Sequence, residues 1–203
     1  MTVDIRQVGE PVLRQRARPL AVEEIRSASI QRLIEQMRDT MREAPGVGLA
    51  APQIGQSLQL AVIEDREEYL QGVSPTILQE RERTVVPFHV IVNPRLTVVQ
   101  DAPAMFFEGC LSLDGFAALV PRAIAVRVDC LNERGEPLVI QARGWHARIL
   151  QHEIDHLNGA LYIDRMLSRS FMSLDNLTKY WSDKTMSHLQ AALGLPNLTP
   201  PQT

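Results

Sequence analysis

Two histidines four residues apart, His152 and His156 in the stretch QHEIDH, are the residues of this sequence best suited to chemistry. In a helix, residues i and i+4 lie one turn apart on the same side, so both imidazoles could bind one metal ion. Glu153 projects sideways from the first histidine and could act as a general base on a water at the metal. The pattern HExxH arises by chance in about one percent of chains of this composition. These residues therefore predict a catalytic metal site, with two structurally satisfied histidines as the alternative.

A third protein ligand decides which chemistry such a metal performs. One class of zinc protease continues the motif to a third histidine, but Tyr162 stands at that position. Another class uses a downstream glutamate, and no glutamate follows Glu153. The downstream carboxylates that remain are Asp164, Asp175 and Asp183. No pattern singles out one of these aspartates, so both protease interpretations lose their main support.

A cysteine in the upstream stretch FFEGCLSLDG is the better candidate. Cys110 follows Gly109 at a predicted strand end, where the backbone can bend and expose the sulfur. One thiolate with two imidazoles leaves a fourth position open, which is typical of a catalytic rather than a structural site. The other cysteine, Cys130, lies in a predicted strand near a hairpin, where a small apolar side chain explains it. With only two cysteines the chain has no disulfide framework.

The glycine-rich stretch GVGLAAPQIG, residues 46–55, allows two interpretations. Its spacing G-x-G-x-x-A matches a dinucleotide-binding fingerprint, but that fingerprint must follow a strand and open a helix. A predicted helix precedes the stretch and Pro52 interrupts any helix after it, so the nucleotide interpretation has little support. The stretch instead suggests a loop that a peptide backbone could approach closely, with Gln53 offering an amide donor.

The helices that position these residues are predicted from hydrophobic spacing. Apolar residues recur with helical period over residues 24–43, and Pro45 with its neighbouring glycines ends that pattern. The period returns over residues 145–157, the segment that carries HExxH. A last helix is predicted over residues 174–193, where leucines and a tryptophan are roughly aligned.

Strands and loops are predicted between these helices. Residues 58–65 and 89–99 are predicted strands, and residues 119–144 a hairpin that turns near NERG. Residues 66–87 are charged and irregular in pattern, which indicates a surface insertion. Residues 195–203 are predicted to be a flexible tail.

Length and composition indicate one domain. The chain has 203 residues, of which 45% are hydrophobic and 22% charged, enough for an ordinary core. With the predicted elements, this indicates a single α+β domain over residues 1–203. We expect mainly antiparallel strands packed around a central helix that bears HExxH, with an N-terminal helix and a C-terminal helix.

Charge and hydropathy exclude several classes of partner. A net charge of −3 gives no reason to expect nucleic-acid recognition or an acidic membrane surface. No apolar run approaches the ~20 residues that span a bilayer. The N-terminal stretch has no apolar signal region, and Asp4 and Glu10 argue against a transit peptide. We therefore expect a cytoplasmic location, or an organelle lumen if a presequence has been removed.

Together, GVGLAAPQ, EGCLS and QHEIDH resemble the three motifs of the peptide deformylase family, in the same order and at similar spacings. The similarity extends from IRQVGEPVLR to about Met166 and is greatest to the branch that includes organellar deformylases. The resemblance implies removal of the formyl group from N-formylmethionyl chains, with release of formate. The implied partners are nascent peptides, and transient contact with the ribosome is compatible with this role.

The resemblance also implies a role for each matching residue. The implied metal ligands are Cys110, His152 and His156. They would hold one divalent ion, Fe(II) in the native enzyme, with zinc, nickel or cobalt able to occupy the same site. Glu153 would be the general base. The developing oxyanion would be stabilised by the backbone N–H of Leu111 and the side-chain amide of Gln53.

Further positions match the substrate site of the family. These positions are Gly46, Val47, Gly48, Gly109, Trp145 and Ile149. Gly46 and Gly48 would let a peptide backbone pair with the loop, and the three larger side chains would line a methionine pocket, with core packing as their alternative role. Glu108 and Arg122 match a family ion pair behind the cysteine, or could be solvated surface charges. Ala117 is uncharged where some family members carry a larger polar residue, which affects contacts beyond the first substrate residue.

Three hypotheses from different classes are compatible with these residues. The first is a metal-dependent deformylase. The second is an endopeptidase that uses the same helix, with Cys110 or an aspartate as third ligand. The third is a non-catalytic zinc-binding module that docks on ribosomes or nascent chains. Glu153 argues against the third, because a structural site needs no base and usually has a fourth protein ligand.

Overall fold

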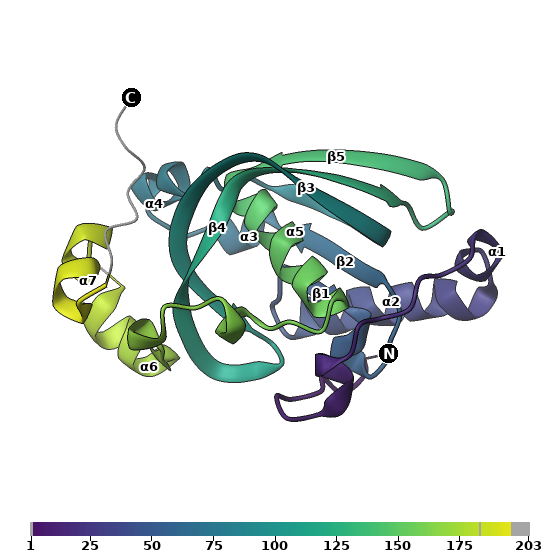
Figure 1. Ribbon diagram of the computed structural model, residues 1–203, viewed down its shortest axis with the longest axis horizontal. Coiled ribbons are helices and arrows are strands. Elements are labelled where there is room, and N and C mark those ends of the chain that lie inside the picture. Colours follow the sequence, from purple (N-terminus) through teal and green to yellow (C-terminus); the bar gives the residue numbers. More distant parts are fainter. Residues whose placement is uncertain (1, 183, 196–203) are drawn as a thin grey trace.

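The computed structural model describes residues 2–182 and 184–195 (Figure 1). Within these residues the strands are β1 (Gly48–Ala50), β2 (Leu60–Asp65), β3 (Val86–Cys110), β4 (Leu113–Leu131), β5 (Pro137–Arg143) and β6 (Met172–Ser173). They form one antiparallel sheet in the order β1-β2-β3-β4-β5, and β6 pairs with β4. The predicted α+β class and the predominance of antiparallel strands are confirmed.

The longer helices lie where the hydrophobic period is strongest. They are α2 (Ala28–Glu43), α5 (Gly144–Leu157) and α7 (Met186–Leu193). The short helices are α1 (Val22–Ile25), α3 (Glu67–Leu70), α4 (Pro75–Glu80) and α6 (Leu174–Asn176), with a π-helical segment at Leu177–Trp181. Single 3-10 turns occur at Pro11–Arg14, Ala51–Ile54, Tyr162–Asp164 and Ser168–Ser170. Among the described residues, no helix is long and apolar enough to cross a bilayer.

Two predicted helices are interrupted by capping residues. Ser27 separates α1 from α2, and its hydroxyl accepts a hydrogen bond from the Ile30 N–H. The prediction of one helix over residues 174–193 is wrong, because α7 begins anew after Thr185, whose hydroxyl accepts from the His188 N–H. Each hydroxyl satisfies a donor of the helix that comes after it, so a new helix starts there although the apolar spacing continues.

Outside the helices, the differences from prediction lie in length and local structure. Residues 66–87 contain α3 and α4, where the sequence pattern suggested irregular chain. The predicted strand over residues 89–99 belongs to a much longer strand, β3. The hairpin turn at NERG is confirmed, with the Asn132 side chain accepting from the backbone N–H groups of Arg134 and Glu136. The tail predicted over residues 195–203 lies outside the described residues, except for Leu195.

Strand β2 separates two halves of the core, because both of its faces are buried. Leu60 and Val62 belong to a cluster with the apolar side chains of α2, whereas Ala61 and Ile63 pack with those of α5. Successive side chains of a strand point to opposite faces, so a strand with six buried residues in a row must be covered on both sides. Helix α2 covers one face of β2, and helix α5 covers the other.

Strands β3 and β4 bend around α5, as Figure 1 shows. Their pairing register shifts near Gln100, Pro103 and Gly109, and such irregularities increase the bend and twist of a strand. The bend brings the end of β3, at Cys110, back toward the C-terminal half of α5, where Cys110 Sγ contacts the His156 ring. The curvature of this strand pair therefore joins the two sequence motifs in space.

Candidate metal centre and active site

Helix α5 is buried on nearly every side, although it carries many polar groups. Its buried apolar residues are Ala147, Ile149, Leu150, Ile154 and Leu157. The polar residues buried with them include Arg148, Glu153, Asp155 and His156. Buried charges are costly unless they are paired or bind a metal, so each of these side chains requires a partner or a function.

Cys110, His152 and His156 bring their potential ligand atoms together at the C-terminal half of α5. Sγ and the ring nitrogens lie within 4.8 Å of one another, and Cys110 Sγ is 3.2 Å from His156 Nε2. The two histidine rings meet edge to face with centroids 5.0 Å apart. In a tetrahedral site with bonds of ~2.3 Å to sulfur and ~2.1 Å to nitrogen, ligand atoms are separated by about 3.4–3.6 Å. The donor set therefore fits one ion, with a fourth position left for water or substrate.

Glu108 orients the first histidine from behind. Its Oε2 atom accepts from His152 Nδ1 at 3.0 Å and from Arg122 Nη2 at 2.9 Å. Its Oε1 atom accepts from Arg122 Nε at 2.9 Å and Arg148 Nη1 at 2.5 Å. Because Nδ1 of His152 is engaged, Nε2 is the nitrogen that can bind a metal. Burial alone would raise the pKa of Glu108, but hydrogen bonds from His152 and Arg122 outweigh it and hold this pKa far below its usual range.

The Glu108–Arg122 pair is buried and extends outward through a second carboxylate. Glu108 and Arg122 are 6% and 4% exposed, so the alternative of solvated surface charges is wrong. Asp155 accepts from Arg122 Nη1 at 2.5 Å and forms two hydrogen bonds of 2.7 Å with Arg165. Helix α5 is thus fixed to β3 and β4 by buried ion pairs as well as by apolar packing.

Gln53 presents its amide N–H to the sulfur of Cys110. The Oε1 atom accepts from the Ala50 N–H at 2.8 Å, which leaves Nε2 on the side of Cys110 Sγ, 3.6 Å away, and of Ser112 Oγ, 3.2 Å away. Gln53 is 2% exposed and lies in the 3-10 turn that begins just after β1. The orientation of this donor is therefore determined by the backbone of its own loop.

Glu153 is buried and faces the glycine loop. Its Oε2 atom has no hydrogen-bond partner among the described residues. Burial raises the pKa of Glu153 to about 7, close to the value that suits a group exchanging protons near neutral pH. A β-carbon at residue 48 would overlap the Glu153 carboxylate, so Gly48 has a steric role that the sequence did not reveal.

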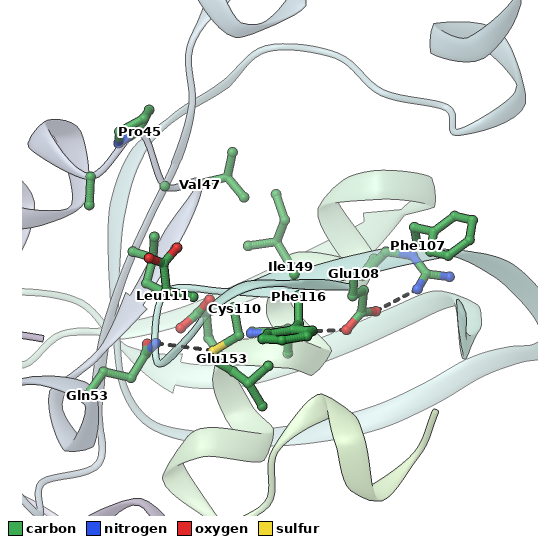
Figure 2. Close-up of a pocket in the computed structure, with 18 of the residues that line it drawn as sticks. Pro45, Val47, Gln53, Phe107, Glu108, Cys110, Leu111, Phe116, Ile149 and Glu153 are labelled. Carbon is green, nitrogen blue, oxygen red and sulfur yellow. Dashed lines mark hydrogen bonds and ion pairs between the residues drawn. The ribbon is translucent and has the colours of Figure 1, made fainter. Parts of the chain in front are cut away.

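A cavity of about 380 Å³ opens beside these groups. Every predicted substrate-binding residue lines it: Gly46, Val47, Gly48, Gly109, Trp145 and Ile149. Figure 2 shows Gln53, Cys110 and Glu153 close together, with the side chains of Val47 and Ile149 nearby on the wall. Ile149 also belongs to the core packed on α5, so both of its predicted roles are compatible with its position.

Tyr162 occupies the sequence position at which one class of zinc protease has a third histidine. It is buried, its ring stacks on His152 with centroids 6.3 Å apart, and its hydroxyl donates to the Phe116 carbonyl. The Tyr162 side chain therefore supports His152 by packing.

Three residues near the centre were missed from the sequence. Arg148 donates a hydrogen bond to Glu108, and Asp155 accepts one from Arg122. The Ser112 hydroxyl accepts a hydrogen bond from the Gln53 amide. Arg148, His152 and Asp155 have the spacing i, i+4, i+7 on one helix. Charged residues at this spacing lie on one face of the helix that carries HExxH, and this pattern could have indicated that they surround the site.

Comparison with known proteins decides the family. The model of the family described as Polypeptide deformylase matches residues 2–171. The chain belongs to the polypeptide deformylase family. Its members are metal-dependent hydrolases that remove the formyl group from an N-terminal formylmethionine. The resemblance inferred from the three motifs is therefore confirmed.

Related deformylases come from organelles and bacteria. The chain is 47% identical over 174 residues to peptide deformylase 1A, chloroplastic, of Solanum lycopersicum, covering 86% of this chain and 63% of the relative. It is 42% identical over 175 residues to the mitochondrial peptide deformylase of Homo sapiens, covering 86% of this chain and 70% of the relative. The chain thus spans somewhat less than two thirds of the tomato protein.

Solved deformylase structures share the fold. The Thermus thermophilus enzyme matches with a TM-score of 0.69 and 40% identity, covering 84% of this chain and 89% of that one. A class I type b peptide deformylase from Acinetobacter baumannii, solved with Met-Ala-Ser bound, matches with a TM-score of 0.73 and 31% identity, covering 82% and 99%. These matches confirm the single-domain α+β fold.

Proposed function

We propose that this chain removes the formyl group from N-formylmethionyl peptides and releases formate, using one divalent ion held by Cys110, His152 and His156. The observation that carries the proposal is the convergence of these three ligand atoms within 4.8 Å. The buried carboxylate of Glu153, whose Oε2 atom has no partner among the described residues, lies on the same helix beside a ligand. Three protein ligands and an adjacent base are typical of a catalytic site rather than a structural one.

The donor set suits several ions. One thiolate and two imidazoles can bind Fe(II), zinc, nickel or cobalt. Because the order of affinity for these ions is similar in most protein sites, the availability of each metal in the cell decides which ion is bound. We propose Fe(II) as the native ion. When bound, the ion polarises the formyl oxygen and lowers the pKa of water to about 7.

Side-chain and backbone groups of the protein transfer the proton and stabilise the oxyanion. Glu153 accepts a proton from the attacking water at its Oε2 atom and delivers it to the leaving amine nitrogen. The Gln53 amide and the Leu111 N–H donate to the oxyanion that develops on the former formyl oxygen, and each such donor typically contributes ~3 kcal/mol to lowering the barrier. The turn that carries Leu111 is held by Gln7, whose amide donates to the Leu111 carbonyl at 3.0 Å. Hydrogen bonds within the protein thus hold the Leu111 carbonyl and the Gln53 side chain, which supports their proposed roles.

The cavity supports methionine as the first residue of the substrate. Its wall includes Val47, Trp145 and Ile149, and a mainly apolar pocket with a few polar groups is the usual form of a small-molecule site. The relative solved with Met-Ala-Ser bound carries a peptide of this kind. We propose that the natural substrates are nascent chains, met near the ribosome in the cytoplasm or in an organelle lumen.

The experiment is a product assay on formyl-Met-Ala-Ser, run anaerobically with Fe(II)-loaded protein. Release of formate without any cleaved peptide bond supports the proposal. Cleavage of an internal bond would instead make the chain an endopeptidase. Absence of turnover in protein that contains one ion per chain would indicate a non-catalytic metal-binding module.

A further inference from the structure

Trp145, on the first turn of α5, is surrounded by cationic side chains. Its ring centroid lies 4.9 Å from the guanidinium carbon of Arg81, 5.3 Å from that of Arg83 and 6.0 Å from that of Arg148. The edge of Phe106 meets it with centroids 6.4 Å apart. The buried indole N–H has no hydrogen-bond partner among the described residues. The ring's position in the cavity wall therefore depends on these neighbours.

Arg83 is a rigid neighbour. It forms two hydrogen bonds, of 2.7 and 2.8 Å, with Asp65, which is fully buried at the end of β2. A bidentate pair between a guanidinium and a carboxylate fixes the plane and the direction of both groups. Arg83 consequently ties the chain after α4 to the central sheet, directly beside Trp145.

Arg81 differs from Arg83 because no carboxylate among the described residues is within hydrogen-bonding distance of it. Burial, together with the charge of Arg83, lowers the pKa of Arg81. Its guanidinium lies over two aromatic rings, Trp145 at 4.9 Å and Phe106 at 5.6 Å. A cation over an aromatic face is attracted by the negative face of the ring, and more strongly when the cation is desolvated. The main interaction of this partly buried charge is therefore with the tryptophan of the pocket wall.

The backbone around Arg81 is also packed on the beginning of α5. A β-carbon at Gly144 would lie 2.7 Å from the Arg81 carbonyl oxygen, and Gly144 has a φ of +58°. Glu82 adopts a φ of +46° there and pairs with Arg143 at 2.7 Å. Residues 81–83 thus pack directly against the start of the helix that carries the metal motif.

We propose that Arg81 is a specificity-determining residue, which holds the Trp145 ring as a rigid wall and so selects methionine as the first substrate residue. The inference rests on the proposed function and assigns a role to residues 81–83, which lie in the predicted insertion outside the three motifs. Without Arg81 the ring can rotate into the space left behind, and the pocket becomes wider and less well shaped. Methionine then loses contacts, whereas a bulkier side chain such as phenylalanine gains room. Discrimination between apolar side chains in such pockets is usually 10- to 200-fold, so the expected change is measurable.

The test compares formyl-Met-Ala-Ser with formyl-Phe-Ala-Ser in Arg81→Ala and Arg81→Lys. We expect the ratio of kcat/KM for the two peptides to fall about tenfold in Arg81→Ala, mainly through a higher KM for methionine with little change in kcat. Arg81→Lys keeps the charge without the planar stack and should lie between parent and Arg81→Ala. Arg134→Ala, at the exposed hairpin turn where Arg134 pairs with Glu136, is the matched control and should leave the ratio unchanged. A ratio that stays within twofold of the parent in both Arg81 variants overturns the proposal.

A second readout does not depend on turnover. The chain has two tryptophans, so Trp181→Phe leaves Trp145 as the only fluorophore of its kind. We expect acrylamide to quench Trp145 more strongly when Arg81→Ala or Arg81→Lys is added, and equal quenching would contradict the proposal. If the parent releases no formate, the proposed function fails on its own. The relative affinities of the metal-loaded parent and Arg81→Lys for Met-Ala-Ser and Phe-Ala-Ser then test the pocket, and an unchanged affinity ratio overturns the role of Arg81.

Discussion

Gly48 and Glu153 face each other so closely that a β-carbon on residue 48 would overlap the Glu153 carboxylate. Gly48 begins β1 and Glu153 lies in the C-terminal half of α5, so the absence of a side chain at residue 48 determines where the Glu153 carboxylate can lie. The glycine loop therefore shapes the proposed catalytic centre directly, in addition to any pairing with a peptide.

Gly48→Ala is expected to abolish most turnover while the metal stays bound. The added methyl group must displace the Glu153 carboxylate, and losing a general base typically costs 10²- to 10⁴-fold in rate. The ligand residues keep their positions, because Gly48 faces the carboxylate rather than the three ligand atoms. Formate release and metal content per chain, measured on the same preparation, check this. Near-parent turnover in Gly48→Ala would show that the carboxylate can work from another position.

Glu153→Gln should keep its ion and lose most activity. The amide preserves the shape of the carboxylate, but it cannot accept the proton of the attacking water. We expect kcat to fall at least 10²-fold with one ion per chain still present. If a metal-loaded Glu153→Gln protein retains near-normal activity, Glu153 is not the base.

Gln53→Leu separates transition-state stabilisation from substrate positioning. Because the Gln53 amide is oriented by the Ala50 N–H toward the sulfur of Cys110, we expect it to donate to the oxyanion more strongly than to the ground-state oxygen. The substitution should lower kcat by roughly 10²-fold and change KM much less. A change in KM alone would make Gln53 a residue that positions the substrate.

A buried pair of histidines is expected to make stability depend on pH. The rings of His89 and His146 meet edge to face 5.3 Å apart, and Nε2 of each is buried without a partner among the described residues. Burial, and then the neighbouring His89, lowers the pKa of His146 to about 4, and burial lowers the pKa of His89. Because the unfolded chain takes up a proton near pH 6.5, stability is full above that pH and is lost as pH falls toward 4.

Urea unfolding at pH 7 and pH 5 measures this effect in the parent and in His146→Phe. After allowance for partial exposure, the parent should lose about 1–2 kcal/mol more free energy of unfolding between these two pH values than the variant does. Equal losses in the two proteins would mean that the histidine pair does not carry the dependence.

Local spacing was enough to predict much of the site. The i, i+4 relation of His152 and His156 is a property of any helix, so these two proposed ligands could be paired from sequence alone. Cys110 could be placed at a strand end because two aromatic residues, Phe106 and Phe107, come shortly before Gly109. The elimination of a third histidine and of a downstream glutamate also required only the order of residues.

Other features depend on contacts between segments far apart in sequence. Glu108 binds Arg148 across 40 residues, and the bend of β3 that permits this arises from register shifts with β4. The packing of Arg81 on Trp145 likewise joins two segments that share no sequence pattern. The C-terminal helix is confirmed as α7, but its predicted bounds of 174–193 are wrong, because a cap at Thr185 starts a new helix within continuous apolar spacing. Such features depend on tertiary packing, which periodicity does not report.

Cobalt substitution tests the proposed metal centre most directly. A Co(II)–thiolate bond gives a charge-transfer absorption band, and Cys110 and Cys130 are both free cysteines on the strand pair β3 and β4. We expect the band in the parent and in Cys130→Ala, with activity retained and at most a modest loss of stability. In Cys110→Ala the band, tightly bound metal and formate release should disappear together. A band that survives in Cys110→Ala, or that vanishes in Cys130→Ala, would contradict the assignment of Cys110 as the third ligand.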